Sequence, residues 1–427
     1  MRYWCERAWL DPTGPQPGVL IEISGEEIVS VSSDEPRPLD AYRLAGLVVP
    51  GFANVHSHAF HRALRGRTHA DGGTFWTWRE GMYHLAGRLN PDNYRRLATA
   101  VFAEMAMAGV TCVGEFHYVH HAPGGRRYSD PNVMAEALRQ AAKDAGIRIT
   151  LLDTCYLAGG IGAELAPEQL RFSDGSAEAW ADRVGELESD ATLLAGAAIH
   201  SVRAVARSAL PEIVAARPNG PLHVHLSEQV QENQACLDAY RMTPTELLAD
   251  AGVLSPRTTA VHATHLTTKD ISLLGSTATG VCFCPTTEAD LADGIGPARE
   301  LVDAGCVLSL GSDQNAVVDP LLESRALEHG ERLRTGQRGR FTPAELYQAL
   351  VEHSGLGWPA GQADLVAIRM DSPRTAGCSP DQAMLAATAA DVHTVISGGR
   401  IVARDGKHEK LGDVGVLLAD AIEEFWR

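Results

Sequence analysis

The chain has 427 residues, of which 45% are hydrophobic, and carries a formal net charge of -17. This size is sufficient for one barrel-sized unit with a small accessory domain, and the charge argues against nucleic acid or an anionic membrane as a partner. The first ten residues lack the apolar core of a signal peptide, and no run approaches the roughly 18 apolar residues of a membrane span. We therefore expect a cytoplasmic protein.

The two ends of the chain show the same kind of pattern. Residues 1–48 alternate short β-type runs with Pro and Gly turns, and the segment from 366 onward contains a strand and a hairpin before the chain ends. We expect residues 1–48 and 366–427 to meet in one small β-sandwich domain that is discontinuous in sequence.

The residues between these ends repeat one pattern, in which an apolar run ends in polar residues and a helical stretch follows. Helical periodicity is clear over 93–109 and 132–146, and each stretch ends at a glycine, as helices prefer. Eight strand-helix units predict an α/β fold with a (β/α)8 TIM-type barrel over residues 49–365. The eight apolar runs are 47–58, 110–118, 147–156, 192–201, 220–228, 258–266, 279–287 and 306–315.

Metal-binding residue types stand where several of these runs end. Barrel enzymes collect their chemistry at the carboxyl ends of the strands, and side chains two apart on a strand point to the same face. Two histidines from one strand, one from another and an aspartate from a third can hold one divalent metal, for which Zn²⁺ is expected and Fe²⁺ is possible. The candidate ligands are His56, His58, His225 and Asp313, and His262 and Glu228 follow the same rule.

Several residues of the same types have simpler interpretations. His223 lies one layer deeper than the candidate ligands and is expected to pack in the core, whereas His265 lies past its strand and is expected to be solvated. Asp313 could instead cap the following helix. The eight cysteines are dispersed and are expected to be reduced thiols, with Cys282 and Cys284 packing in a buried strand.

The motifs PGFANVHSHAF, HVHLSE, VHATHL and LGSDQN resemble the amidohydrolase superfamily. The resemblance implies a metal-dependent hydrolase on this barrel, with a small β-sandwich built from both chain ends. Many members hold two metals bridged by a carbamylated lysine, but the only lysines here are Lys143, Lys269, Lys407 and Lys410, in helical stretches or beyond the barrel. Without a bridging lysine, the resemblance implies one metal per chain. In the mononuclear, deaminating branch a glutamate three residues past the strand-five histidine is catalytic, and Glu228 matches it.

A narrower resemblance is to the formimidoylglutamate deiminases of histidine degradation, carried by HSHAFHRAL, FWTWRE, EFHYVHH and HSVRA. Two departures stand out: His61 replaces a glutamine of the family, and Gln314-Asn315 replace Ser-His after Asp313. The tryptophans Trp76 and Trp78 belong either to the loop core or to the pocket wall. By this resemblance the substrate is held by His61, Arg79, Tyr118, His200 and Arg203.

The implied reaction converts N-formimino-L-glutamate and water into N-formyl-L-glutamate and ammonia. Asp313 would take the proton of the attacking water, Glu228 would protonate the leaving nitrogen, and His262 would orient the attacking oxygen. Two substrate carboxylates in a protein of charge -17 need local cations, and the arginines supply planar donors.

The sequence also allows other functions and other roles for single residues. The alternatives are a purine or triazine deaminase of the same superfamily and a non-catalytic binding relative. For Arg79 the alternative is a surface ion pair. We expect a homodimer, no membrane or nucleic-acid partner, and a candidate active-site loop over 157–175.

Overall fold

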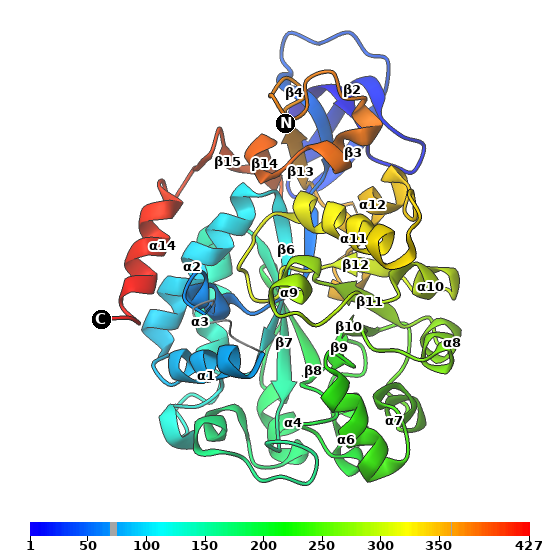
Figure 1. Ribbon diagram of the computed structural model, residues 1–427. Helices are drawn as coiled ribbons and strands as arrows, with labels where there is room; N and C mark the ends of the chain where they lie inside the picture. The colour runs from blue at the N-terminus through cyan, green and yellow to red at the C-terminus, as the bar shows by residue number, and fades with distance from the viewer. Residues whose placement is uncertain (69–74, 360) are drawn as a thin grey trace.

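The computed structural model describes residues 1–68, 75–359 and 361–427, with backbone only at residues 75 and 76. Its centre is a barrel of eight parallel strands in sequential order (Figure 1). Each strand lies within one of the eight predicted apolar runs, so the predicted barrel is confirmed. The strands are β5 (Phe52–Ser57), β6 (Val110–His117), β7 (Arg148–Cys155), β8 (Leu193–Ile199), β9 (Leu222–Leu226), β10 (Thr258–His262), β11 (Gly280–Phe283) and β12 (Leu308–Leu310).

The barrel closes between its first and last strands through the residues that follow β12. Ser57 pairs with Asp313 in a parallel bridge. The backbone N–H groups of Ser312 and Asp313 donate to the His56 carbonyl at 3.0 and 2.9 Å, and the His58 N–H donates to the Asp313 carbonyl at 2.9 Å. This closure brings the histidine pair of β5 next to the aspartate that follows β12.

The helices begin and end at the signals that the sequence carries. Asn90 accepts hydrogen bonds from the Asp92 and Asn93 N–H groups and so caps α2, and Gly146 ends α3 in a left-handed conformation with φ 73°. The helices are α1 (Phe75–Ala86), α2 (Pro91–Met107), α3 (Val133–Ala145), α4 (Ala177–Gly185), α5 (Leu210–Ala216), α6 (Val230–Tyr240), α7 (Pro244–Asp250), α8 (Thr268–Ser276), α9 (Pro285–Asp290), α10 (Ala298–Asp303), α11 (Pro320–Thr335), α12 (Pro343–Leu350), α13 (Ala383–Ala386) and α14 (Val414–Glu423).

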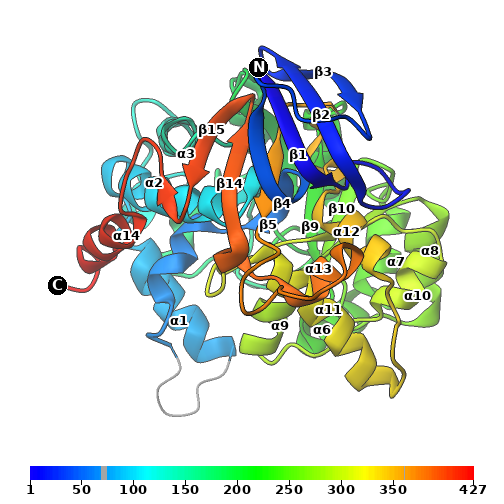
Figure 2. The same cartoon turned by 90° about the horizontal axis from the view of Figure 1, so that it is seen from above.

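Both chain ends contribute to a second sheet, which lies at one end of the barrel (Figure 2). The sheet is mixed: β1 and β4 pair in parallel, whereas β13 pairs with β4 antiparallel. The predicted joining of the two chain ends in one β domain is confirmed, and the domain boundaries stay predictions. The strands are β1 (Arg2–Ala8), β2 (Gln16–Ser24), β3 (Glu27–Ser32), β4 (Tyr42–Pro50), β13 (Leu365–Ile368), β14 (Val392–Ser397), β15 (Arg400–Arg404) and β16 (Lys407–His408).

The last helix, α14, lies beside α2 of the barrel (Figure 1). The Trp426 indole N–H donates to the Ala63 carbonyl at 3.0 Å, and Arg96 pairs with Glu424 at 2.5 Å. Within residues 1–68, 75–359 and 361–427, no helix is both long and apolar enough to cross a membrane.

Candidate metal centre and active site

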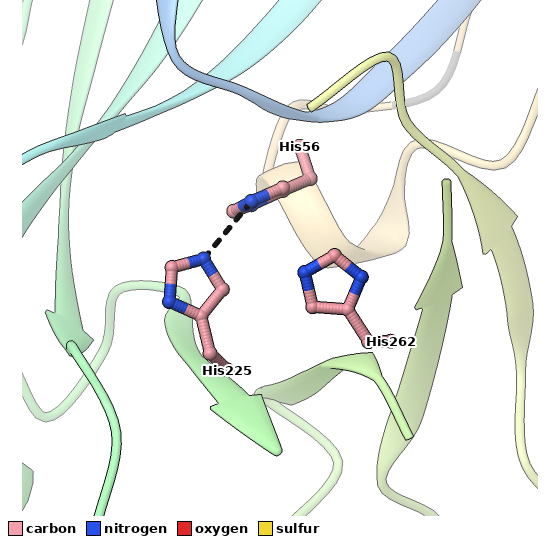
Figure 3. Close-up of side chains that lie close together, drawn as sticks. All are labelled: His56, His225 and His262. Carbon is pink, nitrogen blue, oxygen red and sulfur yellow. Dashed lines mark hydrogen bonds between the residues drawn. The ribbon is translucent and has the colours of Figure 1, made fainter. Parts of the chain in front are cut away.

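Four side chains from three parts of the barrel converge at one point. The Nε2 atoms of His56 and His225 lie 3.1 Å apart, and Asp313 Oδ1 lies 3.4 Å from the Nε2 atoms of both His56 and His58. Figure 3 shows the rings of His56, His225 and His262 pointing toward one another. Two ligands about 2.1 Å from a tetrahedral metal lie about 3.4 Å apart, so these spacings fit one shared metal ion.

The ring nitrogens on the far side of two of these histidines are anchored by backbone carbonyls. His58 Nδ1 lies 2.9 Å from the Phe116 carbonyl, and His225 Nδ1 lies 2.9 Å from the His200 carbonyl. A carbonyl can only accept, so each Nδ1 carries the proton and each Nε2 lone pair faces the site. Burial lowers the pKa of His58 to about 3, which keeps the imidazole neutral as a metal ligand requires.

A side-chain amide holds the backbone behind the predicted ligands. Asn315 Nδ2 donates to the carbonyls of His58 and Asp313 at 3.0 and 3.1 Å and to Ser57 Oγ at 3.1 Å. Both Asp313 and Asn315 have positive φ, at 41° and 55°. Such backbone conformations cost energy in residues other than glycine and persist where surrounding contacts hold them. Asn315, one of the two residues that depart from the family pattern, therefore lies behind the candidate ligands. The other, Gln314, donates from its Nε2 to Asp290 at 2.6 Å.

Two predicted catalytic groups lie at the edge of the ligand cluster. His262 Nε2 lies 3.9 Å from Asp313 Oδ2, and its Nδ1 lies 3.3 Å from Glu288 Oε1. Burial lowers the pKa of His262, but the Glu288 hydrogen bond and the nearby carboxylates of Glu228 and Asp313 raise it well above its ordinary value. His262 also groups with His56 and His225 as a possible metal ligand, a role that we had not predicted for it.

Glu228 is in contact with a predicted substrate residue. Arg203 Nη2 donates to Glu228 Oε2 at 3.2 Å, and Arg203 Nε lies 3.3 Å from Glu232 Oε2. Burial raises the pKa of Glu232 to about 7, although Arg203 opposes this. Arg203 therefore bridges two carboxyl groups, one of which, Glu232, sequence reasoning missed.

The predicted substrate residues surround one cavity of about 350 Å³. The metal-type groups His58, His225, His262 and Asp313 also line it. His61 Nε2 lies 2.9 Å from the Tyr118 hydroxyl, so the histidine that replaces the family's glutamine contacts a predicted substrate residue. Trp78 packs edge-on against His61, with ring centres 5.0 Å apart. Trp78 belongs to the cavity wall, whereas the side chain of Trp76 lies outside the described residues. The cavity is lined by His58, His61, Trp78, Arg79, Tyr83, Tyr118, Tyr156, Phe172, His200, Arg203, His225, Glu228, Glu232, His262 and Asp313, among others.

The candidate loop over 157–175 contributes Ala158 to Ile161 and Phe172 to the same cavity. Arg79 lies on α1 and is partly buried, and its Nε donates to the Tyr83 hydroxyl at 2.5 Å. The predicted active-site loop and Arg79 therefore line the same cavity as the candidate metal ligands His58, His225 and Asp313.

The structure supports some of the simpler interpretations and not others. His223 is fully buried, and its Nε2 lies 2.7 Å from the Gly355 carbonyl, which confirms a core position. His265 is half-buried, so the expectation that it is solvated was only partly correct. Asp319, and not Asp313, caps α11 by accepting from the Leu322 N–H at 3.1 Å. The eight cysteines are free thiols, and Cys282 and Cys284 pack in a buried cluster, as predicted.

The four lysines lie where the sequence suggested. Lys143 and Lys269 are in α3 and α8, and Lys407 and Lys410 lie beyond the barrel. The described structure therefore has no lysine in position to bridge two metals.

A second group of metal-type residues lies elsewhere in the barrel. His117, His120 and Asp153 are buried and close to one another. However, both carboxylate oxygens of Asp153 accept hydrogen bonds from Arg183, at 2.8 Å each, and Trp180 Nε1 donates to one of them at 2.9 Å. A cation already compensates this carboxylate, so the group does not fit a metal site.

Comparison with known proteins places these observations in a family. A model described as "Amidohydrolase family" matches residues 47–354. Formimidoylglutamate deiminase from Pseudomonas aeruginosa is 34% identical, with 95% of each chain covered, and 8-oxoguanine deaminase from the same organism is 29% identical, with 87% of this chain and 85% of the relative covered. The crystal structure of an amidohydrolase from Brucella melitensis has a TM-score of 0.92 at 30% identity, with 100% of both chains covered. That of a Xanthomonas campestris adenosine deaminase with bound zinc has a TM-score of 0.84 at 22% identity, with 100% of this chain and 97% of that chain covered.

Proposed function

This chain belongs to the amidohydrolase family and is a hydrolase of carbon–nitrogen bonds, and from that premise we propose that it converts N-formimino-L-glutamate into N-formyl-L-glutamate and ammonia. One observation carries the proposal: the cavity that holds the metal-type groups is also lined by two arginines, Arg79 and Arg203. A substrate with two carboxylates matches such a cavity, because guanidinium groups bind carboxylates with paired hydrogen bonds. The 34% identity to a formimidoylglutamate deiminase supports the same substrate.

One Zn²⁺ per chain, or Fe²⁺ in its place, would be held by His56, His58, His225 and Asp313. The converging Nε2 atoms and the carboxylate oxygen are a donor set that suits either ion. Such an ion supplies Lewis acidity and lowers the pKa of a coordinated water to about 7. A single metal is proposed because none of the four lysines could bridge a second.

Three side chains would move the protons of the reaction. Asp313 would accept one proton from the attacking water, and Glu228 would deliver a proton to the formimino nitrogen. The second proton of the water is released as the new carbonyl forms and returns to Glu228, while the proton held by Asp313 passes to the same nitrogen, so both side chains recover their starting states. Protonation makes this nitrogen a good leaving group, so it departs as ammonia. His262, 3.9 Å from Asp313, orients the attacking oxygen through a hydrogen bond.

The remaining cavity residues would bind the glutamate part of the substrate. Arg79 and Arg203 each take one carboxylate, and Tyr118 and His200 supply further hydrogen bonds. His61 supports Tyr118 through their 2.9 Å contact. Histidine degradation, the cytoplasm and a homodimer are proposed along with this substrate.

A purine deaminase is the second candidate. Aromatic rings of Trp78, Tyr118 and Phe172 line the same cavity and could stack on a planar base, and 8-oxoguanine deaminase is 29% identical. A neutral base, however, offers no carboxylate to the two arginines that line the cavity.

The test is ammonia release from formiminoglutamate, guanine, adenosine and cytosine by the zinc-reconstituted protein. We expect turnover of formiminoglutamate to exceed that of the other three by orders of magnitude. Preferential release from guanine or adenosine would replace this proposal with the ring deaminase.

A further inference from the structure

A buried glutamine lies behind the cavity wall and contacts two tyrosines. Gln169 lies in the 3₁₀ helix η3 (Pro167–Phe172) and is 2% exposed. Its Oε1 accepts a hydrogen bond from the Ala166 backbone N–H at 2.8 Å. A backbone N–H can only donate, so this bond fixes the orientation of the amide and turns Nε2 away from Ala166. Nε2 then donates to the hydroxyls of Tyr83 and Tyr156, at 2.9 and 2.7 Å.

The oxygens of both tyrosine hydroxyls act as hydrogen-bond acceptors in this group. Arg79 Nε, which is always a donor, also donates to the Tyr83 hydroxyl at 2.5 Å. Two donors therefore occupy the oxygen of Tyr83, and its own hydrogen must point elsewhere. Burial raises the pKa of Tyr156, so that hydroxyl also keeps its hydrogen at neutral pH.

The group as a whole has more donors than acceptors. The guanidinium Nε brings one hydrogen, the amide brings two and each hydroxyl brings one, whereas the two hydroxyl oxygens accept at most two hydrogen bonds each. Gln169 Oε1 accepts from Ala166, and the hydrogen bonds described between Gln169 and the tyrosines involve Nε2, so its second lone pair takes neither hydroxyl hydrogen. Even if the Tyr83 hydroxyl donates to Tyr156, one hydroxyl hydrogen then has no partner within the group. That hydrogen needs an acceptor from outside.

The surplus donor lies on the cavity that holds the metal-type groups. Tyr83, Tyr156 and Arg79 all line it, whereas Gln169 lies behind them. The Tyr156 ring is 4.5 Å from that of His200, whose carbonyl anchors His225. A guanidinium and a hydroxyl with a surplus hydrogen on one wall favour an anionic ligand.

We propose that Tyr83, Tyr156 and Arg79 form a carboxylate-binding wall, and that Gln169 is the positioning residue that directs the hydroxyl hydrogens into the cavity. The ligand class is a short aliphatic dicarboxylate, with Arg203 taking the second carboxylate. The inference rests on the proposed function for the identity of the substrate, but the binding of a dicarboxylate does not depend on the reaction.

A glutamate at position 169 reverses the direction of the hydrogen bonds. A carboxylate keeps the shape and still accepts from Ala166 N–H, but it offers lone pairs to both tyrosines in place of hydrogens. The hydroxyl hydrogens then turn toward residue 169, and the added charge repels an anion. A buried carboxylate also costs stability by itself, so thermal unfolding of this variant is measured alongside its ligand binding.

The experiment measures the dissociation constants of glutarate and butyrate by calorimetry on the zinc-reconstituted protein. Butyrate has one carboxylate and can still use Arg203 when the wall is lost, so the ratio of the two constants reports on the wall. Tyr156→Phe and Gln169→Glu should each weaken glutarate on the order of tenfold or more, the size expected for a hydrogen bond to a charged group, and should reduce its advantage over butyrate. In turnover, Tyr156→Phe should raise KM for formiminoglutamate with kcat nearly unchanged, because the hydroxyl binds a carboxylate that does not react.

The matched control is Tyr347→Phe. It also removes a buried tyrosine hydroxyl, which donates to the Trp9 carbonyl at 3.0 Å and does not line the cavity. Its glutarate affinity should match that of the unchanged protein. Equal losses of glutarate affinity in Tyr347→Phe and Tyr156→Phe would contradict the proposed carboxylate-binding wall, because the effect would then be general destabilisation.

The two proposals fail in different ways. Unchanged glutarate affinity in Tyr156→Phe and Gln169→Glu, with normal turnover of formiminoglutamate, rules out the wall and leaves the proposed function standing. Selective loss of glutarate in these variants supports the wall even if the unchanged protein releases no ammonia from formiminoglutamate, an outcome that rejects the proposed function alone.

Discussion

Replacing Arg203 with methionine tests how the cavity balances its charges. Arg203 lies between two carboxyl groups, with Nη2 3.2 Å from Glu228 and Nε 3.3 Å from Glu232. Methionine keeps much of the side-chain length but removes the charge and all the donors. Both carboxyl groups then lose their cation at once.

The size of the effect follows from the burial of this group. Two unit charges about 4 Å apart interact by about 4 kcal/mol at an effective dielectric constant of about 20, and removing one partner of a buried pair costs about 3–5 kcal/mol. The side chain of Arg203 is 19% exposed and that of Glu232 is fully buried, so screening by solvent is small. We expect Arg203→Met to lower the free energy of unfolding by about 3–5 kcal/mol at high pH.

The cost should depend on pH in a defined direction. The pKa of Glu232 is already raised to about 7 by burial, and it rises further without Arg203. The folded state then binds more protons than the unfolded chain from about pH 4.3, the ordinary glutamate pKa, up to the new value. Stability falls as pH rises through that interval, so Arg203→Met should lose more stability at pH 8 than at pH 6.

The assays are thermal unfolding at both pH values and steady-state ammonia release from formiminoglutamate. KM should rise because a carboxylate loses its partner, and kcat should fall because Glu228 loses the contact that orients it. Arg203→Lys should recover only part of either, since its point charge cannot replace the planar donors. A variant that changes KM alone and unfolds with the unchanged protein's pH dependence would refute the reasoning.

The other predictions concern the metal, proton transfer and one remote carboxyl group. Elemental analysis after reconstitution should give one metal per chain, and two equivalents would contradict the ligand set. Glu228→Gln should keep the metal but lose about 100-fold or more in kcat, because an amide does not transfer protons; near-normal kcat would remove Glu228 from the reaction. Asn315→Ala should weaken metal affinity about 10- to 100-fold in chelator competition, because Asn315 holds the backbone of His58 and Asp313. Burial raises the pKa of Glu323 to about 8, so its contribution to stability should fall from about pH 4.3 to about pH 8, and Glu323→Gln should show a smaller fall in thermal unfolding.

The barrel and the convergence of the histidines at its mouth could be predicted because both depend on local sequence. An apolar run that ends in His56 and His58 fixes a strand and places two side chains on one face, whatever the rest of the chain does. The carboxyl ends of parallel strands meet at one mouth of the barrel, so His225 and Asp313 were expected beside them. In the structure, His56 lies within 3.4 Å of both His225 and Asp313, and His58 lies 3.4 Å from Asp313, as the strand order predicts.

The residues that sequence reasoning missed lie where no strand ends. Glu232 is on α6, Tyr83 is on α1 and Gln169 is in η3. Each has an ordinary place in a helix, and its role depends on which distant side chain it meets. Tyr156 is the exception: it is the last residue of the apolar run 147–156, so the strand-end rule that found the histidines could have found it too.

The charges around the cavity connect the metal with the choice of substrate. The charged side chains that line it include the guanidinium groups of Arg79 and Arg203 and the carboxyl groups of Glu228, Glu232 and Asp313. A dicarboxylate adds two negative charges to this group, inside a protein whose net charge is already -17. A divalent cation, with a proton on Glu232, brings the sum close to neutrality, and burying an uncompensated charge is expensive. Under the proposed function, a bound metal and a dicarboxylate would strengthen each other's binding by the same factor, since coupling between two sites is reciprocal. The proposed metal would then contribute to the binding of an acidic substrate as well as to the reaction.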